Sequence, residues 1–302
     1  MPSFKKGLSK DFVTALKNEY EKRAFWYDVV NDPDLFIGIR DNYLNVYFMG
    51  NSLLKIQLEA GQLQSYTHYK YLLKNKIEDP YVGFDLGGEV DFGDQSFMET
   101  SPSITNLKNA SRPYVGVEKK GVHNIVKANI NVIDVEVALT QEQKDRVRNP
   151  KKEKPTAPRI DFASFIETQN KGLELQFFEA KHFSYGTVLR ARGGNEPEVL
   201  GQLSDYQVLI DKYREEITSS YRSVCCNLVE ILPATRVCPR AKAISDGAPF
   251  AVSNLPRLVI FGFDSDQSNG KNWKPHLEKL KELLPGRVLA RGNSSDFVKG
   301  IG

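Results

Sequence analysis

Asp161, Glu179 and Lys181 are the residues of this 302-residue chain whose types and spacing best suit a chemical site. They occur in two short motifs, Arg-Ile-Asp and Glu-Ala-Lys, eighteen residues apart. Burying carboxylates and an ammonium is costly unless they pair or bind a metal. Oxygen ligands suit Mg²⁺, which activates water for attack on a phosphodiester. A lysine beside the metal can stabilise the charge that develops on the phosphate. The three residues therefore indicate metal-assisted phosphodiester hydrolysis.

Two predicted strands position these groups. Residues 173–183 alternate as a strand whose apolar face ends in Glu179 and Lys181, which are two residues apart and so point the same way. Asp161 lies near the start of the predicted strand 159–166, and a turn at 169–172 joins the two strands. In an antiparallel pair, the start of one strand meets the end of the next. We therefore expect Asp161 beside Glu179.

Other residues could complete the site. Glu136, on a predicted strand over 131–139, could be a third metal ligand, and Glu118, on the preceding predicted helix, is the other candidate. Both are also common surface residues, so the choice stays open.

The predicted helix that Asn195 can cap carries Gln202 and Tyr206, four residues apart on one face. They could orient the metal-bound water, although Tyr206 also belongs to the apolar stripe of that helix and could simply pack. Arg190 and Arg192, in the predicted loop 186–196, suit phosphate oxygens of a nucleic-acid backbone or are solvated loop residues.

The flanking elements describe an α/β fold with a mixed sheet flanked by helices. In chain order we predict a helix, three strands, a helix, a strand and a helix, with a final short strand. The second helix has Asn195 as its N-cap, Pro197 near its first turn and an apolar stripe from Val199 to Tyr213. The other ranges are 114–129, 131–139, 159–166, 173–183, 258–263, 275–284 and 287–290. A loop over 141–158 carries a basic cluster.

Residues 1–110 form a predicted smaller N-terminal accessory module. It has a helix over 9–30 capped by Ser9, a hairpin with strands 42–48 and 53–58, and a helix or strand over 62–76. The stretch 79–112 is rich in Gly, Asp, Pro and Ser, which favours a boundary there. We predict domains at 1–110 and 111–302.

Composition excludes several classes of protein. No segment approaches the length of a membrane span, the first ten residues lack the apolar stretch of a secretory signal, and three cysteines without CxxC spacing argue against a disulfide scaffold and a thiolate zinc site. No P-loop or GxSxG sequence is present. The expected location is the cytoplasm. Residues 111–302 hold 29 Lys and Arg against 23 Asp and Glu, whereas residues 1–110 hold 12 against 15, a mild indication of a polyanionic partner for the second part.

The motifs and their order resemble the PD-(D/E)XK nuclease superfamily, in the subset with a QxxxY element, which Gln202 to Tyr206 matches. The resemblance covers about residues 114–264, and Ile160 replaces the proline of the name motif. It implies a restriction-endonuclease-like αβββαβ core, with metal ligands at Asp161 and Glu179 and a catalytic lysine at Lys181. Gln202 and Tyr206 would support that site.

The sequence thus predicts a Mg²⁺- or Mn²⁺-dependent nuclease that cleaves DNA ahead of RNA, for restriction, defence or repair. It would not bind membranes and could form a homo-oligomer or bind a partner protein. The alternative is a non-catalytic nucleic-acid-binding or assembly protein that retains the fold. A metal-dependent phosphohydrolase acting on nucleotides is a weaker third possibility.

Overall fold

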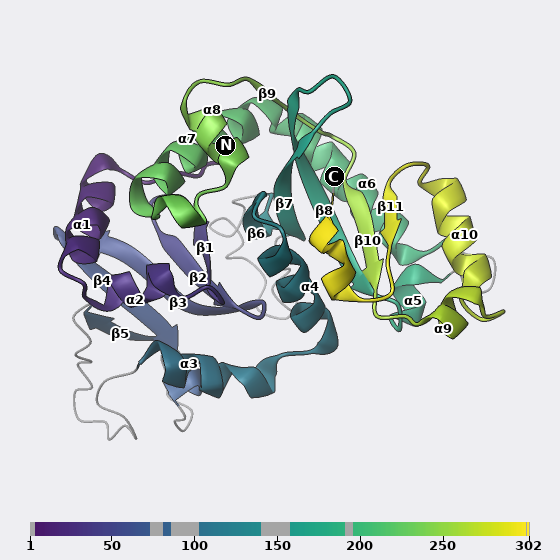
Figure 1. Cartoon of the computed structure of the whole chain (residues 1–302), viewed down its shortest axis with the longest axis horizontal. Coiled ribbons are helices and arrows are strands. Elements are labelled where there is room, and N and C mark those ends of the chain that lie inside the picture. Colours follow the sequence, from purple (N-terminus) through teal and green to yellow (C-terminus); the bar gives the residue numbers. More distant parts are fainter. Residues whose placement is uncertain are drawn as a thin grey trace, which may run out of the picture. The chain divides into compact units, whose positions relative to one another are not determined.

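The computed structural model describes residues 4–72, 81–85, 103–139, 158–190, 196–299 and 301, with backbone alone for 81–85. It is a mixed α/β structure with two sheets flanked by helices (Figure 1). The chain divides into two compact units built from interleaved segments. One comprises residues 1–5, 124–220 and 247–302, and the other comprises residues 6–123 and 221–246.

The first unit contains the mixed sheet, with strand order β11-β10-β8-β7-β6 and a short strand, β9, that also pairs with β8. Strands β6, β7 and β8 form an antiparallel meander, whereas β9, β10 and β11 run parallel to β8. The strands are β6 (Val132–Ala138), β7 (Arg159–Glu167), β8 (Leu173–His182), β9 (Phe250–Val252), β10 (Arg257–Phe261) and β11 (Val288–Ala290).

The helices of this unit follow the strands along the chain. They are α5 (Gly186–Leu189), α6 (Glu198–Lys212), α9 (Ser265–Asn269), α10 (Lys274–Leu283) and the 3-10 turn η4 (Ser294–Lys299). Two further helices, α4 (Val117–Ala128) and α7 (Arg214–Ile231), pass from one unit into the other. Helix α6 buries the apolar stripe that the sequence predicts, namely Val199, Leu203, Tyr206 and Ile210.

Strand β8 lies in the middle of its sheet, between β7 on one edge and the β9 and β10 strands on the other. Its residues from Leu175 to Ala180 are all buried, as expected for a strand covered on both faces. Phe162 on β7 stacks on Phe178 with ring centroids 4.9 Å apart. Apolar packing at the middle of β8 therefore fixes the position of the polar residues near its ends.

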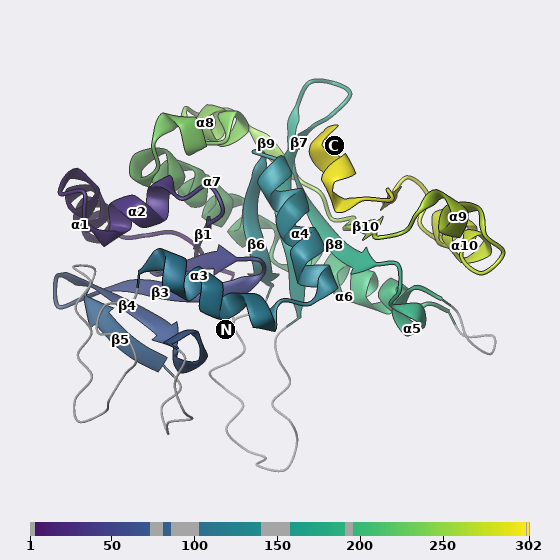
Figure 2. The same ribbon diagram turned by 60° about the horizontal axis from the view of Figure 1, so that its bottom comes forward.

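The second unit contains an antiparallel meander of five strands in the order β1-β2-β3-β4-β5, all labelled in Figure 1 and seen from another side in Figure 2. Its elements are α1 (Lys10–Glu21), α2 (Phe25–Asn31), β1 (Phe36–Ile39), β2 (Leu44–Phe48), β3 (Asn51–Glu59), β4 (Gln62–His68), η1 (Tyr69–Leu72), β5 (Tyr81–Asp85), α3 (Ile104–Ser111), η2 (Arg112–Tyr114), η3 (Ala234–Arg236) and α8 (Pro239–Ser245).

Local chemistry explains several of these elements. The Ser9 hydroxyl accepts a hydrogen bond from the Phe12 amide and caps α1, as the sequence predicts. The β2–β3 hairpin turns at Met49 and Gly50, which both have positive φ, the conformation of a type I′ turn. The predicted helix over 9–30 is instead two helices, because Arg23 adopts a φ of 53° and breaks the helical run.

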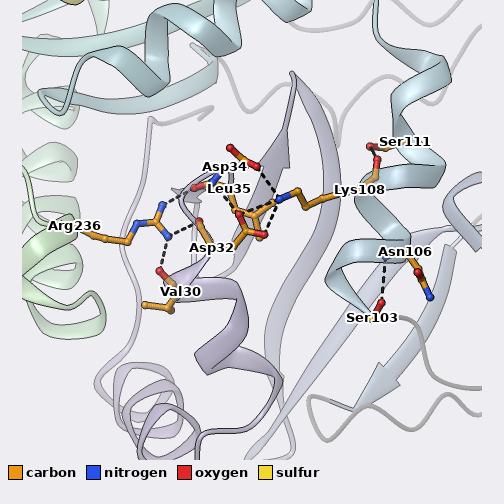
Figure 3. Close-up of polar contacts among 9 residues, drawn as sticks. All are labelled: Val30, Asp32, Asp34, Leu35, Ser103, Asn106, Lys108, Ser111 and Arg236. Atoms are coloured by element: carbon orange, nitrogen blue, oxygen red, sulfur yellow. Dashed lines mark hydrogen bonds and ion pairs between the residues drawn. The ribbon is translucent and has the colours of Figure 1, made fainter.

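A lysine of α3 anchors the loop that follows α2 (Figure 3). The Lys108 ammonium lies 2.8 Å from Oδ2 of Asp32 and 2.9 Å from Oδ2 of Asp34. Burial disfavours the charged ammonium, but its hydrogen bonds to Asp32 and Asp34 outweigh burial and raise the Lys108 pKa. The pair of aspartates thus keeps this cation charged and in place.

Arg236 holds the same loop from the other side (Figure 3). Its guanidinium donates hydrogen bonds to the backbone carbonyls of Val30, Asp32 and Leu35. Val30 lies in the last turn of α2 and Asp32 and Leu35 lie beyond it, where carbonyls have no helical partner. The arginine therefore satisfies backbone acceptors that the helix end leaves open.

Candidate active site

Strand pairing brings Asp161 next to Glu179. Phe162 on β7 pairs with Phe178 on β8, so the next opposed positions outward are Asp161 and Glu179. The Oδ2 atom of Asp161 accepts a hydrogen bond of 2.7 Å from the backbone amide of Ala180. This geometry agrees with the juxtaposition that the sequence predicts.

Glu179 and Lys181 form a buried ion pair. The Lys181 ammonium lies 2.7 Å from Oε1 of Glu179, and the two side chains are 12% and 3% exposed. Such a pair carries a large desolvation cost that its attraction only partly offsets. The two side chains are therefore not a solvent-exposed pair at the end of the strand.

Tyr206 of α6 reaches the same place from the helix layer. Its hydroxyl donates a hydrogen bond of 2.6 Å to the carbonyl oxygen of Arg159, two residues before Asp161. Burial raises the Tyr206 pKa, and the negative charges of Glu179, Asp161 and Glu136 raise it further. Tyr206 therefore remains a neutral hydrogen-bond donor beside the carboxylates, and it fixes the start of β7.

Gln202 does not share the environment of Tyr206. Its side chain is exposed and forms no hydrogen bond within the part of the chain that the structure describes. Four residues on a helix turn through about 400°, so two such residues differ by roughly 40° around the axis. That angle separates the buried stripe, which includes Tyr206, from the position of Gln202. A supporting role for Gln202 stays a prediction.

Glu136 lies opposite Asp161 on the outer strand β6, because the pairs Val135–Phe162 and Val137–Ile160 bracket these two positions. It adopts a φ of 51°, which is unusual for a residue with a side chain. Its carboxylate lies 3.8 Å from the Arg159 guanidinium.

The alternative third carboxylate, Glu118, lies in the first turn of α4, in the segment that belongs to the other compact unit.

The carboxylates fit a small oxygen-bound cation in part. Within the described ranges, no group of three or more His, Cys, Asp or Glu residues is arranged to hold a metal ion. Glu136 therefore does not complete a three-carboxylate cluster with Asp161 and Glu179 in this conformation; it lies beside Arg159 instead. Mg²⁺ commonly uses one or two carboxylates and keeps several waters, and a carboxylate accepts more than one contact. Asp161 and Glu179 thus supply the number and type of oxygen ligands that a Mg²⁺ site commonly takes from the protein.

Of the two predicted phosphate-contacting arginines, Arg190 follows α5 directly and is half-buried. Its guanidinium carbon lies 5.3 Å from the ring centroid of Trp273. Arg192 lies outside the described residues.

Sequence reasoning overlooked two kinds of residue here. Arg159 supplies the carbonyl that Tyr206 binds and the cation beside Glu136, but nothing in its motif signals either role. Trp273 packs on Arg190 from 83 positions away in the chain, and only the fold brings the two together. Separately, Asp264 caps the short helix α9 by accepting a hydrogen bond from the Gln267 amide.

Comparisons of this chain with protein-family models, with curated proteins and with solved structures give no significant match. Among the helices that the structure describes, none has both the length and the apolar character required to cross a bilayer.

Proposed function

We propose that this protein is a metal-dependent nuclease of the PD-(D/E)XK type. The observation that carries the proposal is the buried Glu179–Lys181 pair next to Asp161. The element order supports it: a helix (α4), three antiparallel strands (β6, β7 and β8), a helix (α6) and a strand parallel to β8 (β10) occur in this order along the chain, with α5 before α6 and with α7, η3, α8 and β9 before β10. That order agrees with the αβββαβ core that the proposal implies.

In this proposal Asp161 and Glu179 hold Mg²⁺ or Mn²⁺. When bound, such an ion polarises the scissile phosphate and lowers the pKa of an attacking water. The Lys181 ammonium donates hydrogen bonds toward the phosphate oxygens as negative charge develops on them. Tyr206 acts as a positioning residue, since its hydroxyl holds the Arg159 carbonyl and thereby the β7 segment that carries Asp161.

The proposed substrate is a nucleic acid, with DNA ahead of RNA. The excess of Lys and Arg over Asp and Glu in residues 111–302 favours a polyanion. Arg190 is the described residue best suited to a backbone phosphate, because a guanidinium matches the geometry of phosphate oxygens.

One observation favours the non-catalytic alternative, a nucleic-acid-binding protein that retains the fold. The Lys181 ammonium contacts a carboxylate oxygen of Glu179 directly. In a metal site, that oxygen would be expected to bind the metal ion instead. A lysine that neutralises Glu179 in place of a metal would stabilise the fold and leave it without turnover.

A cleavage assay distinguishes the nuclease from the non-catalytic binding protein. The purified protein is incubated with plasmid, linear and single-stranded DNA and with RNA. The incubations contain Mg²⁺, Mn²⁺ or EDTA. We expect metal-dependent cleavage that falls at least about 100-fold in Glu179→Gln and Lys181→Ala while binding persists. Glu174→Gln and Lys171→Ala are matched controls, because they change the same residue types at the far end of β8 and in the preceding turn. Binding without cleavage in either metal would instead establish the alternative.

A further inference from the structure

A pocket of about 530 Å³ lies at the carboxyl end of strands β8 and β10. Phe183, two residues beyond Lys181, lines it on the β8 side, and Asp264 lines it on the β10 side. Pockets of roughly 300–1,000 Å³ accommodate small organic ligands. In open α/β sheets, ligands commonly bind beyond the carboxyl ends of parallel strands. The pocket therefore begins where the candidate active site ends.

An aromatic and cationic wall closes one side of the pocket. Trp273 is 2% exposed, and its ring lies 6.2 Å from the ring of Phe183 and 5.3 Å from the Arg190 guanidinium carbon. A planar guanidinium held against an indole presents its N–H edges in a fixed direction. Arg190 is thus preorganised rather than solvated at the end of a loop.

The Arg190 guanidinium lines this pocket without a polar partner among the described residues. Within the described part of the chain, its guanidinium forms no ion pair and no hydrogen bond, and its Nε atom is buried. The indole Nε1 of Trp273, also buried, has no hydrogen-bond partner among the described residues either. Buried donors without acceptors are costly, and sites that bind a ligand are a common reason for them. Two such donors belong to residues that line this one pocket.

The charges around the pocket balance. The lining has two cationic residues, Arg190 and Lys271, and two acidic residues, Asp264 and Asp266, and the Asp264 carboxylate is already engaged in capping α9. A surface for binding bare phosphate would carry an excess of cations. A balanced lining with amide groups suits a ligand that has one anionic group and a polar, aromatic body.

We propose that this pocket binds a single unpaired nucleotide of the nucleic-acid strand. Its phosphate lies on Arg190 and Lys271, and the base edge meets the polar side chains of Gln267 and Asn272, which also line the pocket. Base edges present donors and acceptors that amides and carboxylates match. This inference rests on the proposed nuclease function and deepens it, since the preferred substrate becomes a single-stranded or frayed strand.

Intrinsic fluorescence tests the proposal directly. The chain has two tryptophans, and Trp26 lies fully buried in α2 of the other compact unit. In a Trp26→Phe, Lys181→Ala background with EDTA, the emission of Trp273 reports on the pocket without turnover. The probes are thymidine 5′-monophosphate, thymidine and inorganic phosphate. We expect a saturable change with the nucleotide and little or none with thymidine or phosphate at the same concentration.

Variants assign the binding to the pocket. Arg190→Ala and Lys271→Ala should each weaken nucleotide binding about tenfold or more, since each removes a charge-assisted contact. Lys279→Ala, on exposed α10 and outside the pocket lining, is the matched control and should leave affinity unchanged. Arg190→Lys keeps the charge and protects the test against a folding defect of Arg190→Ala. Equilibrium dialysis of the wild-type protein measures the same affinity without the Trp26 change.

The outcomes separate this proposal from the proposed function. No saturable change, or an affinity in Arg190→Ala and Lys271→Ala equal to that of Lys279→Ala, would overturn the pocket assignment even if the protein cleaves polymers. Nucleotide binding that depends on Arg190 and Lys271, without cleavage of any polymer, would support the pocket and overturn the nuclease.

Discussion

Each compact unit holds a cluster of charged residues, and the two clusters differ in their balance of positive and negative groups. Around Asp32, two aspartates face Lys108 and Arg236, and the arginine also binds three backbone carbonyls. Around Glu179, carboxylates gather on adjacent strands with one ammonium among them. The first cluster satisfies its groups within the protein and fixes a loop. The second is short of positive charge, which is the condition under which a cation or a phosphate-bound metal adds stability.

The largest expected effect comes from replacing Arg236, which tests whether its cluster stabilises the fold. Arg236→Met leaves the carbonyls of Val30, Asp32 and Leu35 without their donor, so we expect the free energy of unfolding to fall by about 3 kcal/mol. Urea denaturation measures it. Lys242→Met, which removes an exposed surface pair, should change stability by less than about 0.5 kcal/mol. Equal effects of the two changes would show that the loop does not depend on Arg236.

The opposite behaviour is expected at Glu179. Glu179→Gln removes one of the crowded carboxylates and still offers an oxygen to Lys181, so stability should change by no more than about 1 kcal/mol although cleavage is lost. Thermal unfolding with and without Mg²⁺ provides the measurement. Added Mg²⁺ should stabilise the wild type and not the variant. A large loss of stability in the variant would assign Glu179 a structural role like that of Asp32.

Tyr206 sharpens the comparison through pH. Its raised pKa means that the folded state keeps the phenol proton at a pH where the unfolded chain loses it. Its contribution is therefore complete below about pH 10 and declines as the pH rises above that value. Tyr206→Phe should cost about 1 kcal/mol at pH 8 and show a smaller further loss at pH 11 than the wild type. Urea titrations at both pH values test this, with Tyr185→Phe, an exposed phenol, as the control. Parallel curves for wild type and Tyr206→Phe would refute it.

The smallest expected effect concerns the backbone of Glu136. Glycine adopts a positive φ without steric cost, so Glu136→Gly should raise the free energy of unfolding by about 0.5–1 kcal/mol, less the weak pair with Arg159. Glu167→Gly, at the exposed end of β7, should lower it. Chemical denaturation compares the two. A loss of stability in Glu136→Gly would mean that its carboxylate contributes more than its backbone strain costs.

Strand pairing made the centre of the candidate site predictable. Asp161 and Glu179 lie on consecutive strands joined by a short turn, and side chains alternate between the two faces of each strand. The same local rules placed β6, β7, β8 and α6. They failed where distant contacts decide the structure. Helix α7 has a Ser- and Cys-rich sequence with weak helical preference, and it was not predicted. The Arg190–Trp273 contact joins residues that no local pattern relates. Likewise, the four-residue spacing of Gln202 and Tyr206 did not reveal that only Tyr206 is buried.

One edge of β8 has a consequence for biosynthesis. Among the described residues, β9 and β10 cover that edge, and they pair with Leu173–Leu175 and with Phe178–His182. Their first residues, Phe250 and Arg257, come 77 and 79 positions after their partners Leu173 and Phe178. A ribosome that has released β8 still has to add those residues before the edge finds its native neighbours. Until then the strand presents unpaired amides and carbonyls on a strongly apolar segment, which is the template for association between chains. Truncation before residue 250 should therefore yield aggregates rather than a smaller folded protein.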